Sequence, residues 1–137
     1  MKYAYVFEDK GSDKLQEIKK LGEKWFGLYL MNQTDSVSDI ERMKNKKIIK
    51  DLDDKIFDIM KKSFNMNDME IRKAFENAIS KVSKDYGIKI KNFGGMNRLF
   101  FDMDIDNSKL KGNGTLEKSA YKNFGTKLAE YIMLYHI

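Results

Sequence analysis

Apolar and polar residues follow two different periods along the chain, and these periods predict its secondary structure. The first period appears in residues 2–8, where Tyr3 and Tyr5 lie on one side and Ala4 and Val6 on the other. A period of two predicts a β-strand. Because both sides are largely apolar, we expect this strand to lie inside a sheet.

The next segment, residues 13–31, has the period of a helix that Asp13 can cap. Its expected buried stripe comprises Leu15, Ile18, Leu21, Trp25, Leu28 and Tyr29. Gly22 could instead end the helix, and residues 24–31 would then form an extra strand weakened by Gly27. We expect one continuous helix and keep the strand as the alternative.

Two further helices are predicted in the middle of the chain. Ser38 and Glu41 form a capping box, so a helix starts there. Asn67 and Glu70 repeat this pattern at the start of a helix over residues 67–85. The apolar rows expected to be buried are Ile40, Met43, Leu52, Ile56, Ile59, Met60 and Phe64 in the first helix, and Ile71, Phe75, Ala78, Ile79 and Val82 in the second.

Residues 88–93 and 96–106 have the pattern of two strands joined by Gly94 and Gly95. Two glycines can adopt the positive φ angles that a two-residue hairpin turn requires. That turn would place Ile90 opposite Leu99 and make one side of the hairpin apolar. The other side would carry Lys89, Lys91, Arg98, Phe100, Asp102 and Asp104.

A final helix is predicted from Thr115, and the last seven residues of the chain are almost all apolar. We expect this end to dock on the sheet or on a second subunit, which would give a homodimer. The chain lacks proline, linkers and repeats, so a single domain over residues 1–137 is predicted. The expected fold class is α+β, with the N-terminal strand and the hairpin 88–106 packed as a small antiparallel sheet against about four helices, in the order β-α-α-α-β-β-α.

Charge adds a candidate binding surface. The net charge is +5, and clustered cations gain affinity for polyanions by releasing counterions. Only three of the 26 basic residues are arginine, however, and lysine lacks the bidentate fork that favours phosphate recognition. One cluster on a predicted helix comprises Lys44, Lys46, Lys47 and Lys50. This cluster could meet a phosphate backbone or an acidic protein, although a solvated helix face is the simpler explanation.

The alternating residues Asp102, Asp104 and Asp106 raise the question of a metal site. A calcium loop starting at Asp102 needs glycine at its sixth position and glutamate at its twelfth, where this chain has Asn107 and Asn113. Neighbours on one face of a strand stand roughly 7 Å apart, too far for a two-metal centre. The alternation of the three aspartates is explained if they lie on the solvent-exposed face of a strand. Asp102 and Asp104 remain weak candidates for a magnesium ion.

The chain lacks the residues that other common kinds of active site require. The chain has no cysteine, and its only histidine is His136. Thiolate sites, a cysteine nucleophile and a histidine-based triad are therefore not expected, and we predict no catalytic residues and no cofactor. No segment of 18 consecutive residues is apolar and free of charged residues. We therefore expect no membrane span and a cytoplasmic location.

By elimination, we expect a non-enzymatic binding protein that occupies a surface of a protein or nucleoprotein partner. An inhibitor or accessory factor of nucleic-acid-processing machinery is the more specific hypothesis. One alternative is direct binding of single-stranded RNA or DNA on an open sheet face, with bases stacked on aromatics such as Phe100 and phosphates held by Lys89, Lys91 and Arg98. The other alternative is magnesium-dependent phosphodiester chemistry at Asp102 and Asp104.

Overall fold

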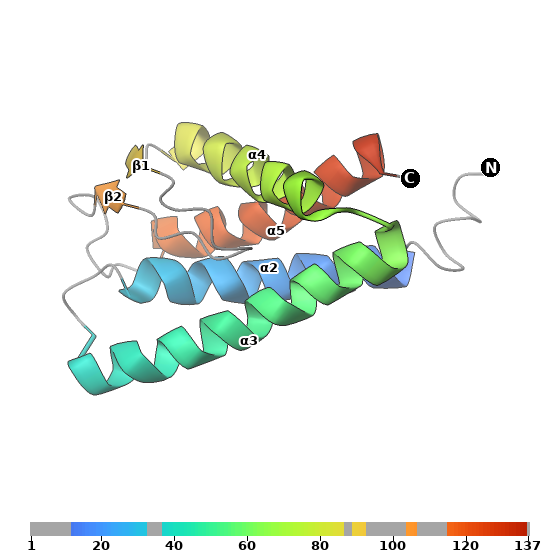
Figure 1. The fold of residues 1–137 in the computed structure, drawn as a ribbon. Coiled ribbons are helices and arrows are strands. Elements are labelled where there is room, and N and C mark those ends of the chain that lie inside the picture. Colours follow the sequence, from blue (N-terminus) through green and yellow to red (C-terminus); the bar gives the residue numbers. More distant parts are fainter. Residues whose placement is uncertain (1–11, 33–36, 87–88, 93–103, 107–114, 137) are drawn as a thin grey trace.

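The computed structural model describes residues 12–32, 37–86, 89–92, 104–106 and 115–136. Its helices are α2 (Ser12–Asn32), α3 (Asp39–Phe64), α4 (Asp68–Tyr86) and α5 (Thr115–Tyr135). Two short strands, β1 (Lys89–Asn92) and β2 (Asp104–Asp106), lie between α4 and α5 in the chain. Consecutive helices run in opposite directions, and the two strands lie at one end of them (Figure 1).

The predicted α+β class is wrong, because helices build the core of the described residues. Every residue of the buried apolar cluster lies on a helix except Met66, which connects α3 to α4. The strands form only a two-stranded antiparallel pair. The predicted N-terminal strand, residues 2–8, lies outside the described residues. Four amphipathic helices bury their apolar stripes against one another, so the described part needs no sheet as a packing layer.

The predicted hairpin register is also wrong. Ile90 of β1 pairs with Ile105 of β2 rather than with Leu99, and Lys89 pairs with Asp106. The register then shifts between Ile90 and Asn92. A two-residue turn at Gly94 and Gly95 would pair Ile90 with Leu99, so it does not fit the observed pairing. Both glycines and residues 96–103 of the second predicted strand lie outside the described residues.

The capping patterns of α3 and α4 are confirmed. The Ser38 Oγ accepts a hydrogen bond of 3.2 Å from the backbone N–H of Glu41. At the start of α4, the Asn67 side chain accepts from the Glu70 N–H at 2.8 Å, and the Glu70 carboxylate accepts from the Asn67 N–H at 3.0 Å. α3 ends at Phe64, and its C-cap Asn65 has the left-handed angles φ 54° and ψ 38°. These local patterns therefore place the boundaries of both helices.

Helix α2 runs unbroken through Gly22, so the prediction of one helix is confirmed and residues 24–31 do not form a strand. Gly22 faces α5, where a Cβ added to it would lie 3.3 Å from the Cα of Gly125. A Cβ added to Gly125 would overlap the carbonyl oxygen of Lys19. These glycines serve close backbone packing rather than helix termination.

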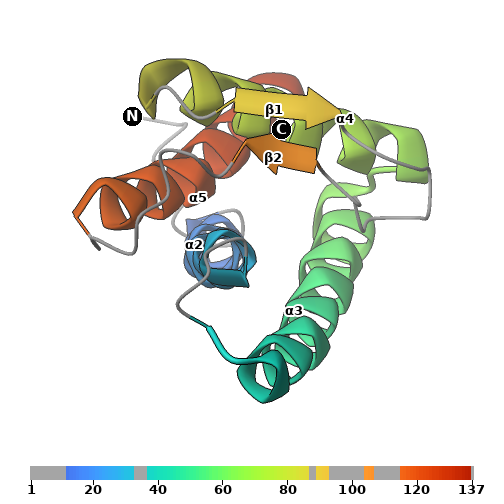
Figure 2. The same ribbon diagram turned by 90° about the vertical axis from the view of Figure 1, so that its left-hand side faces the viewer.

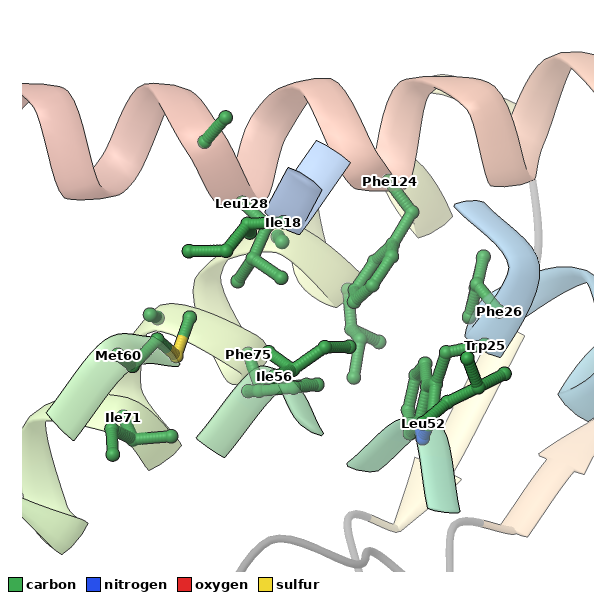
Figure 3. Packing of buried hydrophobic residues seen from close by; sticks show 14 of the residues in the cluster. Ile18, Trp25, Phe26, Leu52, Ile56, Met60, Ile71, Phe75, Phe124 and Leu128 are labelled. Atoms are coloured by element: carbon green, nitrogen blue, oxygen red, sulfur yellow. The ribbon is translucent and has the colours of Figure 1, made fainter. Parts of the chain in front are cut away.

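An aromatic cluster joins α2, α4 and α5 at the centre of the core (Figure 3). The Trp25 ring stacks on Phe124 with centroids 5.3 Å apart, and it meets Phe75 edge-on, also at 5.3 Å. Phe26 stacks on Phe124 at 4.7 Å. Such pairs contribute about 0.5–1.5 kcal/mol each beyond their buried area. From α3, the buried residues shown beside this cluster are Leu52, Ile56 and Met60.

Candidate functional site

The predicted basic cluster lies on the first half of α3, where Lys44, Lys46, Lys47 and Lys50 are all exposed. Residues three or four positions apart are neighbours on a helix, so the four side chains form one continuous patch. Within the described part of the chain, no acidic group forms an ion pair with any of them. Asp51 and Asp54 follow one turn later and limit the positive charge in that direction.

Exposed apolar side chains adjoin the lysines. Ile40 is 69% exposed and Met43 is 65% exposed, although both were expected in the buried row of this helix. Met43 lies one turn before Lys46 and Lys47, so apolar and basic side chains share a single surface. We call this surface the α3 face, and it comprises Ile40, Met43, Lys44, Lys46, Lys47 and Lys50.

A polar junction explains why Ile40 and Met43 face outward. The Asn32 side chain, on a residue only 9% exposed, donates to the Arg42 carbonyl at 3.2 Å and accepts from the Asn45 side chain at 2.9 Å. The Arg42 Nε donates to the Asn32 carbonyl at 3.1 Å. Arg42 and Asn45 thus occupy the side of α3 that faces α2, and this orientation turns Ile40 and Met43 toward solvent.

The residues predicted for an open sheet face are only partly described. Lys89 and Lys91 lie in β1 and Asp104 lies in β2, whereas Arg98, Phe100 and Asp102 lie outside the described residues. The single-stranded nucleic-acid platform therefore stays a prediction. Among the side chains that the structure describes, no group of three or more His, Asp or Glu is placed to hold a metal ion.

Part of the apolar C-terminal end of α5 packs against the rest of the protein. Ile132 is fully buried, and the His136 Nδ1 lies 3.6 Å from a carboxylate oxygen of Glu70 at the start of α4. Three large apolar side chains stay exposed here, namely Met133, Leu134 and Tyr135. The end therefore packs against α4 rather than against a sheet, and part of it remains available to a second copy of the chain.

A groove that the sequence did not predict lies on the outer side of α2, beside Tyr121 of α5. Its volume is about 400 Å³. Its apolar lining consists of Leu28, Met31 and Tyr121, and its charged lining of Lys20, Glu23 and Lys24. Gly27 completes the lining. The only sequence signal for this groove was Gly27 in the interior of a helix. That glycine points to the groove only when the structure shows that Tyr121 packs against it.

Comparison of the chain with known protein families, with curated proteins and with solved structures finds no match. None of the helices in the described ranges is both long enough and apolar enough to cross a membrane. A function can therefore be inferred only from the surfaces of this chain.

Proposed function

We propose that the protein is a non-enzymatic binding protein that occupies a surface of a protein or nucleoprotein partner through the α3 face. The observation that carries this proposal is the cluster of four exposed lysines without an acidic partner among the described residues, next to the exposed Ile40 and Met43.

The composition of the α3 face suits such a role. Large apolar side chains that gather on a surface often mark an interaction site, and methionine is enriched at interfaces. Unpaired lysines around them steer association toward an acidic surface and raise the rate of encounter. The junction of Asn32, Arg42 and Asn45 holds the underlying helix in place, which lowers the entropy lost on binding.

The more specific proposal is an inhibitor or accessory factor of nucleic-acid-processing machinery. Nucleic acid surrounds such machinery with dense negative charge, and a net charge of +5 favours association with negatively charged surroundings. We also propose a cytoplasmic location, which the lack of cysteine permits.

Affinity purification from an extract of the native host tests the proposal. The triple variant Lys46→Glu, Lys47→Glu, Lys50→Glu should recover at least about tenfold less of the partner than the unmodified chain. The matched control is Lys73→Glu, Lys81→Glu, Lys84→Glu, which makes the same charge change at exposed positions of α4. Equal recovery with both triple variants would contradict the proposal, provided that both have the unfolding midpoint of the unmodified chain.

Direct binding of RNA or DNA by the same lysines is a separate outcome. Fluorescence anisotropy with a labelled single-stranded oligonucleotide measures it as salt rises from about 50 mM to about 200 mM. A steep loss of affinity would support direct nucleic-acid binding. Contact with the protein surface of the partner predicts instead that nuclease treatment of the extract leaves recovery of that protein unchanged.

A further inference from the structure

Gly27 lets the Tyr121 ring pack against the backbone of α2, and this ring forms one side of the groove. A Cβ added to Gly27 would lie 3.2 Å from Cδ2 and 3.3 Å from Cγ of Tyr121, so the tyrosine ring lies directly against the helix backbone. The Tyr121 ring covers Gly27 at this point, and the groove is lined by this ring together with the apolar side chains of Leu28 and Met31. The result is an open, shallow apolar groove with the Tyr121 ring on one side, and we call it the slot.

The rim of the slot is more positive than negative. Lys20 and Lys24 lie one turn apart on the exposed side of α2, and Glu23 is the single acid beside them. Neither lysine forms an ion pair with any acid in the described ranges of the chain. Two cations therefore flank an apolar slot without a partner for their charge.

The slot extends toward the α3 face through Met31. The Asn45 side chain lies 3.9 Å from the Met31 sulfur, which places this wall of the slot against the first turns of α3. Lys44 precedes Asn45 in the same turn, and Ile48 follows it by one turn. A ligand that extends beyond Met31 would therefore meet further apolar and basic side chains.

We propose that this slot binds an acidic, amphipathic peptide segment of a protein partner. One apolar side chain of the segment packs against Leu28, Met31 and Tyr121, and carboxylates beside it pair with Lys20 and Lys24. The open shape suits an extended or helical segment, and methionine adapts its packing to varied apolar anchors. A phosphate backbone would meet Glu23 and would leave the apolar wall unused. The proposal deepens the function proposed above and rests on it in one respect, that the partner is a protein.

Titration of the ¹⁵N-labelled full chain with synthetic peptides tests the slot. The probe is Glu-Glu-Leu-Phe-Glu-Glu-Leu-Leu-Glu-Glu, with one control that replaces every glutamate by glutamine and another that replaces leucine and phenylalanine by alanine. Chemical-shift changes should centre on residues 20–31 and Tyr121. Both control peptides should bind at least about tenfold more weakly, because each lacks one of the two recognised features.

Charge reversal supplies the second arm of the test. Lys20→Glu with Lys24→Glu should weaken peptide binding at least about tenfold, whereas Lys73→Glu with Lys81→Glu on α4 should leave it unchanged. Both pairs are exposed, so each variant should keep its unfolding midpoint. The proposal is overturned if the two pairs weaken binding equally, if the shift changes lie away from the slot, or if a single-stranded oligonucleotide binds there and the peptide does not.

The two proposals can fail separately. A peptide that binds the slot while the α3 triple variant still recovers the host partner would contradict the α3 face alone. Loss of the host partner in the α3 variant, together with no peptide binding to the slot, would contradict the slot alone.

Discussion

Three glycines in the interiors of α2 and α5 have different physical roles. A glycine in a helix interior costs about 1 kcal/mol relative to alanine, so each position needs a compensating contact. Gly22 and Gly125 let the two backbones approach, which brings Phe26 and Phe124 to a ring distance of 4.7 Å. Gly27 instead accommodates the ring of Tyr121.

The variant Gly125→Ala should be destabilised by more than about 2 kcal/mol, even though alanine is the better helix former. Its Cβ would overlap the Lys19 carbonyl oxygen and lie 3.2 Å from the Glu23 nitrogen, and backbone atoms cannot rotate away. Denaturant unfolding measures the change. Gly27→Ala is the matched control and should lose less than about 1 kcal/mol, because a tyrosine ring can shift by a few tenths of an ångström. Equal stability of the two variants would contradict this packing.

At the scale of the elements, short-range chemistry sets the helix boundaries. α4 begins at Asp68, soon after α3 ends at Phe64, and Asn65 turns the chain between them. Met66 follows it into the core and is 3% exposed, with its N–H donating to the Met60 carbonyl at 3.1 Å. The left-handed backbone at Asn65 is therefore what joins the two helices.

Replacement of Asn65 tests this turn. Asn65→Ala should lose about 1 kcal/mol, because a Cβ-bearing residue without a short polar side chain adopts left-handed angles poorly. Asn65→Gly should stay within about 0.5 kcal/mol of the unmodified chain, because glycine adopts them freely. Thermal unfolding followed by circular dichroism compares the two. If the alanine variant were as stable as the glycine variant, the left-handed cap at this position would be wrong.

At the scale of the whole molecule, the four helices contribute differently to the core. The aromatic cluster joins α2, α4 and α5, whereas α3 packs mainly against α2. In the end view of Figure 2 the first turns of α3 lie apart from α4 and α5. Asn32, Arg42 and Asn45 hold these turns through hydrogen bonds rather than through apolar burial. This arrangement leaves the α3 face accessible to a partner.

The exposed end of α5 leads to a prediction about assembly. We expect a homodimer through Met133, Leu134 and Tyr135, of which Leu134 is 69% exposed. Leu134→Lys should raise the dissociation constant at least about tenfold, because it places a charge in an apolar contact. Analytical ultracentrifugation measures the change, with Met43→Lys on α3 as the control that keeps the dimer. Sedimentation of the unmodified chain as a monomer at all concentrations would exclude this interface.

The sequence by itself determined the features that depend on residues three or four positions apart. The capping boxes at Ser38 and Asn67 and the apolar stripes of α2 and α4 belong to this class. They could be predicted because a helix repeats every 3.6 residues and its end groups need nearby side chains. The exposure of the lysines on α3 could be predicted in the same way, from their positions in the helical repeat.

Only the tertiary structure decided the features that depend on contacts between distant segments. Three features each require contact with a second helix: the packing of Gly22 on Gly125, the outward orientation of Ile40, and the slot lined by Gly27 and Tyr121. The pairing of Ile90 with Ile105 likewise differs from the pairing that a turn at two glycines predicts. Local periodicity shows which side of an element is apolar, but whether that side meets a helix, a sheet or solvent depends on the free energy of packing the whole chain.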